Sequence, residues 1–294
     1  MGPGLSSRAI PSKNMANATT ALSAQIPLDP DRAARPLFVL HERIAAGAGP
    51  QHSHRRHQLI YAADGVVTVT AGRGWWVVPP QRAVWVPAGT PHRVAAKAPF
   101  ALCSLYVSTR LRRGWPGHCQ VVAVPPLLRE LLLEAAGFGD RYPARGPQRR
   151  LLDVAVDRIA MLDVAPLSLE LPRDLRARRV AEALRADPSE RRPLAEWGRR
   201  VGASVRSLER LFLRDTGMSF ARWRAQARLL AALERLGAGR SVTQVALEVG
   251  YDDPSSFIAA FKRALGVTPR RYFHPVAGAA ARASVGASRT RKST

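Results

Sequence analysis

Cysteine is scarce in this chain of 294 residues, which contains only Cys103 and Cys119. Two cysteines at this spacing fit neither a disulfide framework nor the ligand pattern of a zinc site. We therefore expect free thiols in a reducing compartment. The chain also lacks any stretch approaching the ~18 consecutive apolar residues of a membrane span, and its first residues lack the apolar run of a signal peptide. These absences predict a cytoplasmic protein without a membrane partner.

Acidic residues are few as well. There are 22 Asp and Glu against 45 Lys and Arg, which gives a formal net charge of +23. Residues 171–294 carry +14 of this charge, although they form less than half of the chain. A basic excess concentrated in one part of a chain favours a polyanionic partner. Hydrophobic residues still make up 46% of the sequence, which is enough for packed cores and argues against general disorder.

The hydrophobic pattern divides the chain into five parts. Residues 1–34 and 274–294 show no periodicity, and we predict a flexible arm and a disordered basic tail. Residues 35–110 contain short β-branched and aromatic runs separated by Gly, Pro and Asp, which is typical of a small antiparallel barrel or sandwich. Residues 111–173 change to a helical period and predict a hairpin of two helices. Residues 174–273 are also predicted to be helical.

The helical hairpin has a leucine-rich face on each helix, beginning near Leu127 and Leu151. Such a face needs an apolar partner. Its partner is either the β-rich part of the same chain or a second copy in a homodimer, and the pattern is compatible with both. Residues 111–173 are therefore predicted to be a linker and a possible dimerisation region.

Residues 174–273 contain an internal repeat with a nearly constant offset of 48 or 49 residues. The matching pairs are Gly202 with Gly250, Phe212 with Phe261, and Gly217 with Gly266. A constant offset indicates two copies of one structural unit. Each copy has the pattern of a short helix, a turn at glycine and a second helix.

Capping signals place the helices of the second copy. Ser241 with Gln244 three residues later is typical of a capping box at a helix start. Asp253 followed by Pro254 predicts an N-cap with proline at the first helical position. Gly266 predicts the end of the same helix. A helix-turn-helix unit needs this turn, because its second helix enters the major groove of DNA.

The second helix of each unit is predicted to carry the DNA contacts. Arginines and small polar groups on its exposed side suit phosphates and base edges. These candidates are Arg206, Ser207, Glu209, Arg210 and Arg214 in the first unit, and Pro254, Ser255, Ser256, Ile258, Ala259 and Lys262 in the second. An apolar stripe between Ser219 and Leu236 predicts a connecting helix that holds the two units at a fixed separation.

Two long motifs in this region carry a resemblance. GYDDPSSFIAAFKRALGVTPRRY (250–272) and LERLFLRDTGMSFARW (208–223) are similar to the DNA-binding domain of the AraC/XylS family of transcriptional regulators. The resemblance covers residues 174–273, about a third of the chain. It implies base contacts from both second helices. The base-contacting positions that it implies are Arg206, Glu209, Arg210, Pro254, Ser255, Ile258 and Ala259.

The β-rich part resembles the cupin fold in the motifs HSHRRHQLIYAADG (52–65) and PAGTPH (87–92). In cupins, such histidines converge inside a barrel. His52 and His54 alternate on one strand face, Gln58 takes the place of the usual Glu, and His92 completes the set. The three histidines could hold a divalent transition metal such as Zn²⁺, Ni²⁺ or Fe²⁺, or all four residues could line a metal-free pocket for a small molecule. His57, of opposite parity, is predicted to lie at the surface.

Together these patterns predict an α+β protein with two domains. An N-terminal cupin-like β-barrel with a helical hairpin precedes a C-terminal all-α domain with two helix-turn-helix motifs. The favoured function is a ligand-responsive transcriptional regulator that binds double-stranded DNA, and RNA polymerase would be a further partner of an activator. A cupin metalloenzyme fused to a DNA-binding domain is the alternative. Gln58 cannot act as a general base, which disfavours that alternative.

Overall fold

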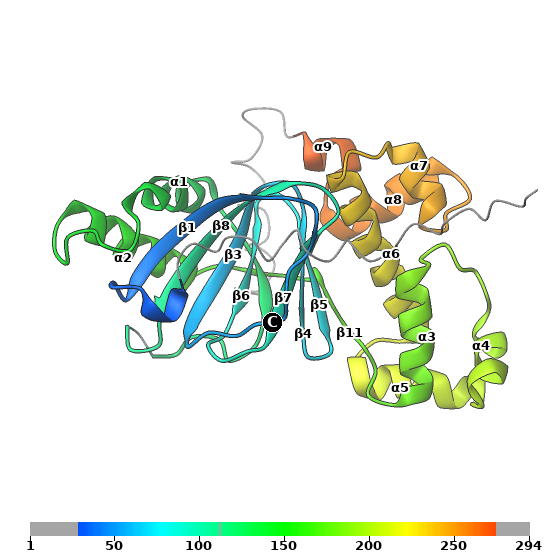
Figure 1. The fold of residues 1–294 in the computed structure, drawn as a ribbon. Coiled ribbons are helices and arrows are strands. Elements are labelled where there is room, and N and C mark those ends of the chain that lie inside the picture. The colour runs from blue at the N-terminus through cyan, green and yellow to red at the C-terminus, as the bar shows by residue number, and fades with distance from the viewer. Residues whose placement is uncertain (1–28, 112, 275–294) are drawn as a thin grey trace, which may run out of the picture.

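The computed structural model describes residues 29–111 and 113–274. It confirms the predicted two-domain α+β architecture, in which the β domain lies between a helical hairpin and a helical domain (Figure 1). The predicted arm (1–34) and tail (274–294) fall almost entirely outside the described residues. No helix in the described part of the chain is both long and apolar enough to cross a membrane.

The β domain consists of two sheets. One has six strands in the order β1-β8-β3-β6-β9-β10, and the other has five in the order β11-β5-β4-β7-β2. Strand pairing among the described residues does not close the sheets into one ring, so the domain is a sandwich rather than a closed barrel. The strands are β1 Leu37–Ile44, β2 Gly47–Ala48, β3 Arg56–Asp64, β4 Val67–Ala71, β5 Gly74–Val78, β6 Arg82–Val86, β7 His92–Ala96, β8 Phe100–Ser108, β9 Gln120–Ala123, β10 Val164–Ala165 and β11 Ser168–Glu170.

The helical hairpin covers the outer face of the six-stranded sheet. It is formed by α1 (Pro126–Ala135) and α2 (Pro147–Ile159), whose buried side chains include Leu128 and Leu152. Most of each leucine-rich face therefore packs on its own domain, which is one of the two predicted alternatives, whereas Leu127 is 54% exposed. The segment from 111 to 173 also contains three strands of two to four residues. Strands this short show no measurable period, which is why the sequence did not reveal them.

The helical domain contains two helix-turn-helix units joined by one long helix. Its helices are α3 Leu175–Ala186, α4 Leu194–Val201, α5 Val205–Thr216, α6 Phe220–Gly237, α7 Val242–Glu248, α8 Pro254–Leu265 and α9 Pro269–Phe273. The predicted caps are confirmed, because Ser241 accepts a hydrogen bond from the backbone of Gln244 and Asp253 accepts one from Ser256. Gly202 and Gly250, which end the first helix of each unit, both have positive φ. An L-residue would be strained there.

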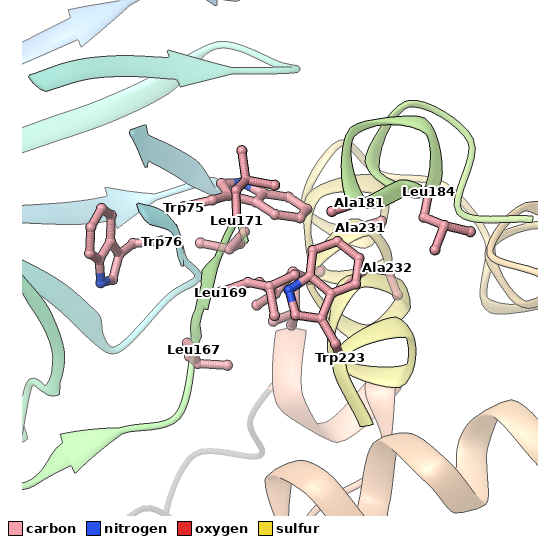
Figure 2. Close-up of a cluster of buried hydrophobic side chains, with 14 of the residues drawn as sticks. Trp75, Trp76, Leu167, Leu169, Leu171, Ala181, Leu184, Trp223, Ala231 and Ala232 are labelled. Atoms are coloured by element: carbon pink, nitrogen blue, oxygen red, sulfur yellow. The ribbon is translucent and has the colours of Figure 1, made fainter. Parts of the chain in front are cut away.

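The two domains share a hydrophobic core along the outer face of the five-stranded sheet (Figure 2). Trp75 and Trp76 of β5 point to opposite faces, as consecutive strand residues must, and Trp75 faces the helical domain. Leu169 of β11 pairs with Trp75 and is 2% exposed. Trp223 of α6 is fully buried in the same cluster. The interface is thus packed like a domain interior.

We predict that Leu169→Ala lowers the free energy of unfolding by about 2–5 kcal/mol, because it opens a cavity in this shared core. Since the core spans both domains, β and helical structure should be lost in one transition. Leu175→Ala is the control: its side chain is 68% exposed, so the cost should stay within about 0.5 kcal/mol. Urea unfolding followed by circular dichroism and tryptophan fluorescence measures both. Equal stability of the two variants would contradict the prediction.

Candidate DNA-binding surface and histidine cluster

The first helix-turn-helix unit presents two exposed arginines on its second helix. Ser204 starts α5 by accepting a hydrogen bond from the backbone of Ser207, and Leu208 packs inward. Arg206 and Arg210 lie on the opposite, exposed side of α5. Their guanidinium groups have the donor geometry that reads guanine or phosphate.

Two other predicted contacts of α5 have partners within the chain. The Glu209 carboxylate accepts a hydrogen bond from the backbone N–H of Phe220 at 3.2 Å, at the start of α6. The exposed Arg214 guanidinium donates to Asp215 at 2.7 Å and lowers the pKa of that carboxyl to about 2. Asp215 also accepts from the backbone of Asp174, so it ties α5 to α3. The base contact predicted for Glu209 stays a prediction, and its observed contact is structural.

The second unit presents a surface of small residues. On α8, Ser255, Ser256 and Ala259 are exposed, Ile258 is half-buried, and Phe257 packs inward. The other members of the predicted set are half-buried Pro254 and exposed Lys262. The Ser256 hydroxyl donates to Asp253 at 2.6 Å within the N-cap. With few hydrogen-bond donors, this helix is suited to close approach and apolar contact with DNA.

The three histidines predicted to converge do come together inside the β domain. One potential ligand atom from each of His52, His54 and His92 lies within 4.8 Å of those of the others. His54 and His92 are 5% and 0% exposed, and His52 is half-buried. The expectation that His52 and His54 share a strand is wrong, because both precede β3. His52 instead forms an isolated β-bridge with His92 at the start of β7. The His54 carbonyl accepts a hydrogen bond from the backbone N–H of Gly89, so the segment from His52 to His54 lies beside the start of β7.

Each histidine has its Nδ1 atom against a backbone carbonyl. The distances are 3.2 Å from His52 to Pro50, 2.7 Å from His54 to Arg56 and 2.9 Å from His92 to Thr90. Burial lowers the pKa of His92 to about 4, so its ring is neutral near pH 7. A neutral ring that donates from Nδ1 has a lone pair on Nε2. The arrangement is the one in which a second hydrogen bond orients a metal-binding histidine.

The Gln58 amide lies between the histidines and two hydroxyls. One of its two polar atoms lies 3.0 Å from Nε2 of His54 and 3.1 Å from Nε2 of His92. The other lies 3.0 Å from the hydroxyl oxygens of both Ser104 and Tyr106. If the amide oxygen faced the rings, both nitrogens of each ring would meet acceptors. A neutral His92 ring whose Nδ1 donates to Thr90 requires the opposite orientation, in which the amide NH₂ faces the rings and the amide oxygen accepts from the hydroxyls.

Sequence reasoning missed Ser104 and Tyr106. Ser104 is 1% exposed, and burial raises the pKa of the Tyr106 phenol, which stays protonated. Both belong to β8, where Gln58 of β3 pairs with Tyr106. A serine in the apolar strand FALCSLYVS was the available signal, because a buried polar residue needs a partner. Its register with Gln58 was not visible in the sequence.

The surface position predicted for His57 is wrong. The His57 ring is half-buried, stacks on Trp85 with centroids 5.1 Å apart, and faces the backbone N–H of Ala88 at 3.1 Å. It lies on the outer face of the six-stranded sheet, which the loop around Trp115 covers. Trp85 and Trp115 also border a cavity of about 150 Å³ beside the end of α2. The alternation along the strand correctly predicts that His57 points away from the interior of the sandwich. The outer face on which it lies is covered by the loop around Trp115.

Two family models match the chain. The AraC-like ligand binding domain matches residues 35–152, which cover most of the β domain and most of the hairpin. The helix-turn-helix domain matches residues 197–274, from α4 to the end of α9. The matches therefore fall on the two domains that contain the histidine cluster and the exposed recognition helices.

The chain is similar to the HTH-type transcriptional regulator NimR of Escherichia coli K12, with 36% identity over 246 residues, which is 83% of this chain and 90% of NimR. RipA of Corynebacterium glutamicum is 39% identical over 35% of this chain and 31% of its own length. The structure of ToxT from Vibrio cholerae aligns with 83% of this chain and with its own full length, at 11% identity and a TM-score of 0.36. Because the NimR likeness extends through both domains, the chain belongs to the AraC family of DNA-binding transcriptional regulators.

Proposed function

We propose that this regulator contacts a bipartite DNA site through α5 and α8 and responds to an effector at the histidine cluster. The observation that supports DNA contact most directly is the exposure of Arg206 and Arg210 on α5. In the first unit, the proposed contact surface consists of Arg206, Ser207, Glu209, Arg210 and Arg214, with Arg206, Glu209 and Arg210 at the base-contacting positions. In the second unit, Pro254, Ser255, Ser256, Ile258, Ala259 and Lys262 form the contact surface.

The spacing of the two units supports a bipartite site. Helix α6 has 18 residues, which correspond to about 27 Å of helix. With the adjoining turns, this length approaches the ~34 Å between successive major grooves on one face of DNA. We propose that one monomer contacts two half-sites about one helical turn apart.

The donor set at the histidine cluster fits a divalent transition metal. His52, His54 and His92 would bind it through Nε2 atoms that their Nδ1 hydrogen bonds hold in place. Bound metal would supply a Lewis-acidic position for an anionic or oxygen-bearing effector. The competing proposal is a metal-free pocket, which the Gln58 amide favours because it already occupies two of the lone pairs.

An enzymatic function is disfavoured by the same cluster. Among the described residues, the potential metal ligands there are three histidines without a carboxylate. Gln58 is engaged by hydroxyls and imidazoles and has no basic atom to remove a proton. We propose a purely regulatory role in the cytoplasm, where the chromosomal DNA lies.

Further partners are proposed from the surface. Leu127 and Val154 of the hairpin are 54% and 46% exposed, so a homodimer would use this side of the β domain. An activating regulator would also contact RNA polymerase. Analytical ultracentrifugation of the Leu127→Asp and wild-type proteins separates a dimer through this surface from a monomer.

We predict that Arg206→Ala and Arg210→Ala each weaken binding to the selected operator by about 1–3 kcal/mol, because each removes a base contact. The probe is a duplex that the wild-type protein selects from a randomised library, with affinities measured by fluorescence anisotropy at fixed salt. Arg149→Ala, in α2, is the control, since it removes the same charge far from the helical domain. Wild-type affinity of both α5 variants would refute the assignment.

We predict that Gln58→Glu increases the affinity for Zn²⁺ or Ni²⁺, because a carboxylate adds a charged ligand beside three imidazoles. A metal present at a hundred times its Kd should stabilise the wild-type fold by about 2.7 kcal/mol, and His92→Ala should abolish this effect. Thermal unfolding with and without metal, together with elemental analysis of protein purified without chelators, measures both effects. No stabilisation of either wild-type or Gln58→Glu protein would leave the metal-free pocket as the correct description.

A further inference from the structure

One face of α6 packs against the β domain along most of the helix. Trp223, Gln226, Leu230, Glu234 and Gly237 follow at intervals of three or four residues and therefore share this face. From first to last they span about 21 Å of helix. The β domain contacts this face near both of its ends (Figure 1).

The first contact involves β11. Trp223 donates its indole N–H to the carbonyl of Glu170 at 2.8 Å, and the Gln226 amide donates to the carbonyl of Pro166 at 2.6 Å. The Trp223 ring also packs against Phe212 of α5, with centroids 5.5 Å apart. This contact therefore joins the edge strand of the five-stranded sheet to the recognition helix of the first unit.

The second contact involves the Glu234 carboxylate, whose side chain is only 12% exposed. It accepts a hydrogen bond from the Thr68 hydroxyl of β4 at 2.6 Å and pairs with the Lys97 ammonium at 3.0 Å. The neighbouring residue Arg235 pairs with Glu248 of α7 at 3.1 Å. This contact therefore lies where the second unit joins α6.

The last turn of α6 leaves no room for a side chain against the turn between β3 and β4. A Cβ atom added to Gly237 would lie 2.1 Å from Cγ2 of Val66. Alanine is a much better helix former than glycine, so the glycine serves the close packing and not the helix. Close packing and the ion pair of the largely buried Glu234 side chain together fix this end of α6.

Strand β4, whose Thr68 binds the Glu234 carboxylate, also lies next to the histidine cluster. Strand β4 pairs with β7, with Thr68 opposite Ala95 and Ala71 opposite His92. Thr68 and His92 have opposite parity in this pair of strands, so one faces α6 and the other faces the interior. The cluster and the second contact thus lie on opposite faces of the same two strands.

We propose that the β domain sets the relative position of the two helix-turn-helix units through these two contacts, with Glu234 as a positioning residue for the second unit. This inference rests on the proposed bipartite binding of DNA. Each contact attaches one unit to a different strand, β11 or β4, and β5 lies between them. Loss of either contact frees one unit to shift relative to the other, while the contact residues on α5 and α8 remain unchanged.

The experiment compares two duplexes and uses the full chain. One is the duplex that wild-type protein selects from a randomised library, and the other is the same duplex with one half scrambled. The ratio of the two affinities measures how well the units act together. Glu234→Gln and Thr68→Val should each lower this ratio about tenfold and leave the half-site affinity unchanged. The double variant should lose no more than either single one, because both break the same contact.

Glu182→Gln is the matched control. It removes the same charge from an exposed ion pair with Arg178 on α3, so the ratio should stay within about twofold of wild type. An insertion of two base pairs between the halves should weaken wild-type binding more than binding by Glu234→Gln.

An unchanged ratio in Glu234→Gln and Thr68→Val would overturn the proposal and show that the helical domain alone holds its units. Equal losses on both duplexes would also overturn it, because they indicate a folding defect. Failure of the proposed function looks different: the wild-type protein itself would then bind the full and scrambled duplexes equally.

Discussion

The packing of α6 between the five-stranded sheet and both helix-turn-helix units is the contact on which the rest of the structure depends. Trp223 is fully buried there, and large buried side chains contribute roughly 1.5–3 kcal/mol each. The same helix supplies core residues to both units, including the ring contact with Phe212. One helix therefore completes three packing surfaces, and none of them can be rearranged without disturbing the other two.

Electrostatics imposes a second constraint inside the β domain. Buried polar groups are costly unless each donor meets an acceptor, and the Gln58 amide meets this requirement by joining two rings and two hydroxyls. The burial that keeps His92 neutral also leaves its Nε2 lone pair directed at the amide. A bound metal or effector must replace those hydrogen bonds. Its affinity therefore depends on the difference in free energy between the hydrogen-bonded site and the occupied site.

Local signals predicted much of this structure, and long-range signals predicted less. The cap at Asp253 depends on neighbouring residues, so the sequence was enough to place α8. The convergence of His92 with the other histidines followed from a motif. In contrast, β11 has three residues, and only its pairing with β5 makes it a strand. The contact of Glu209 with Phe220 and that of Thr68 with Glu234 depend on how elements pack, which no local pattern encodes.

The position of β11 has a consequence for how such regulators are recombined. In the sequence, β11 lies in the connection between the two domains. It pairs with β5 of the β domain, and its Glu170 carbonyl accepts a hydrogen bond from Trp223 of α6. An edge strand normally exposes unpaired backbone groups, and here Trp223 covers the carbonyl of Glu170 in β11, while Gln226 covers that of Pro166 just before the strand. A domain boundary placed on either side of β11 separates it from some of these contacts. An exchange of domains between relatives must therefore keep matching β11 and α6 surfaces, and the two domains change as a pair.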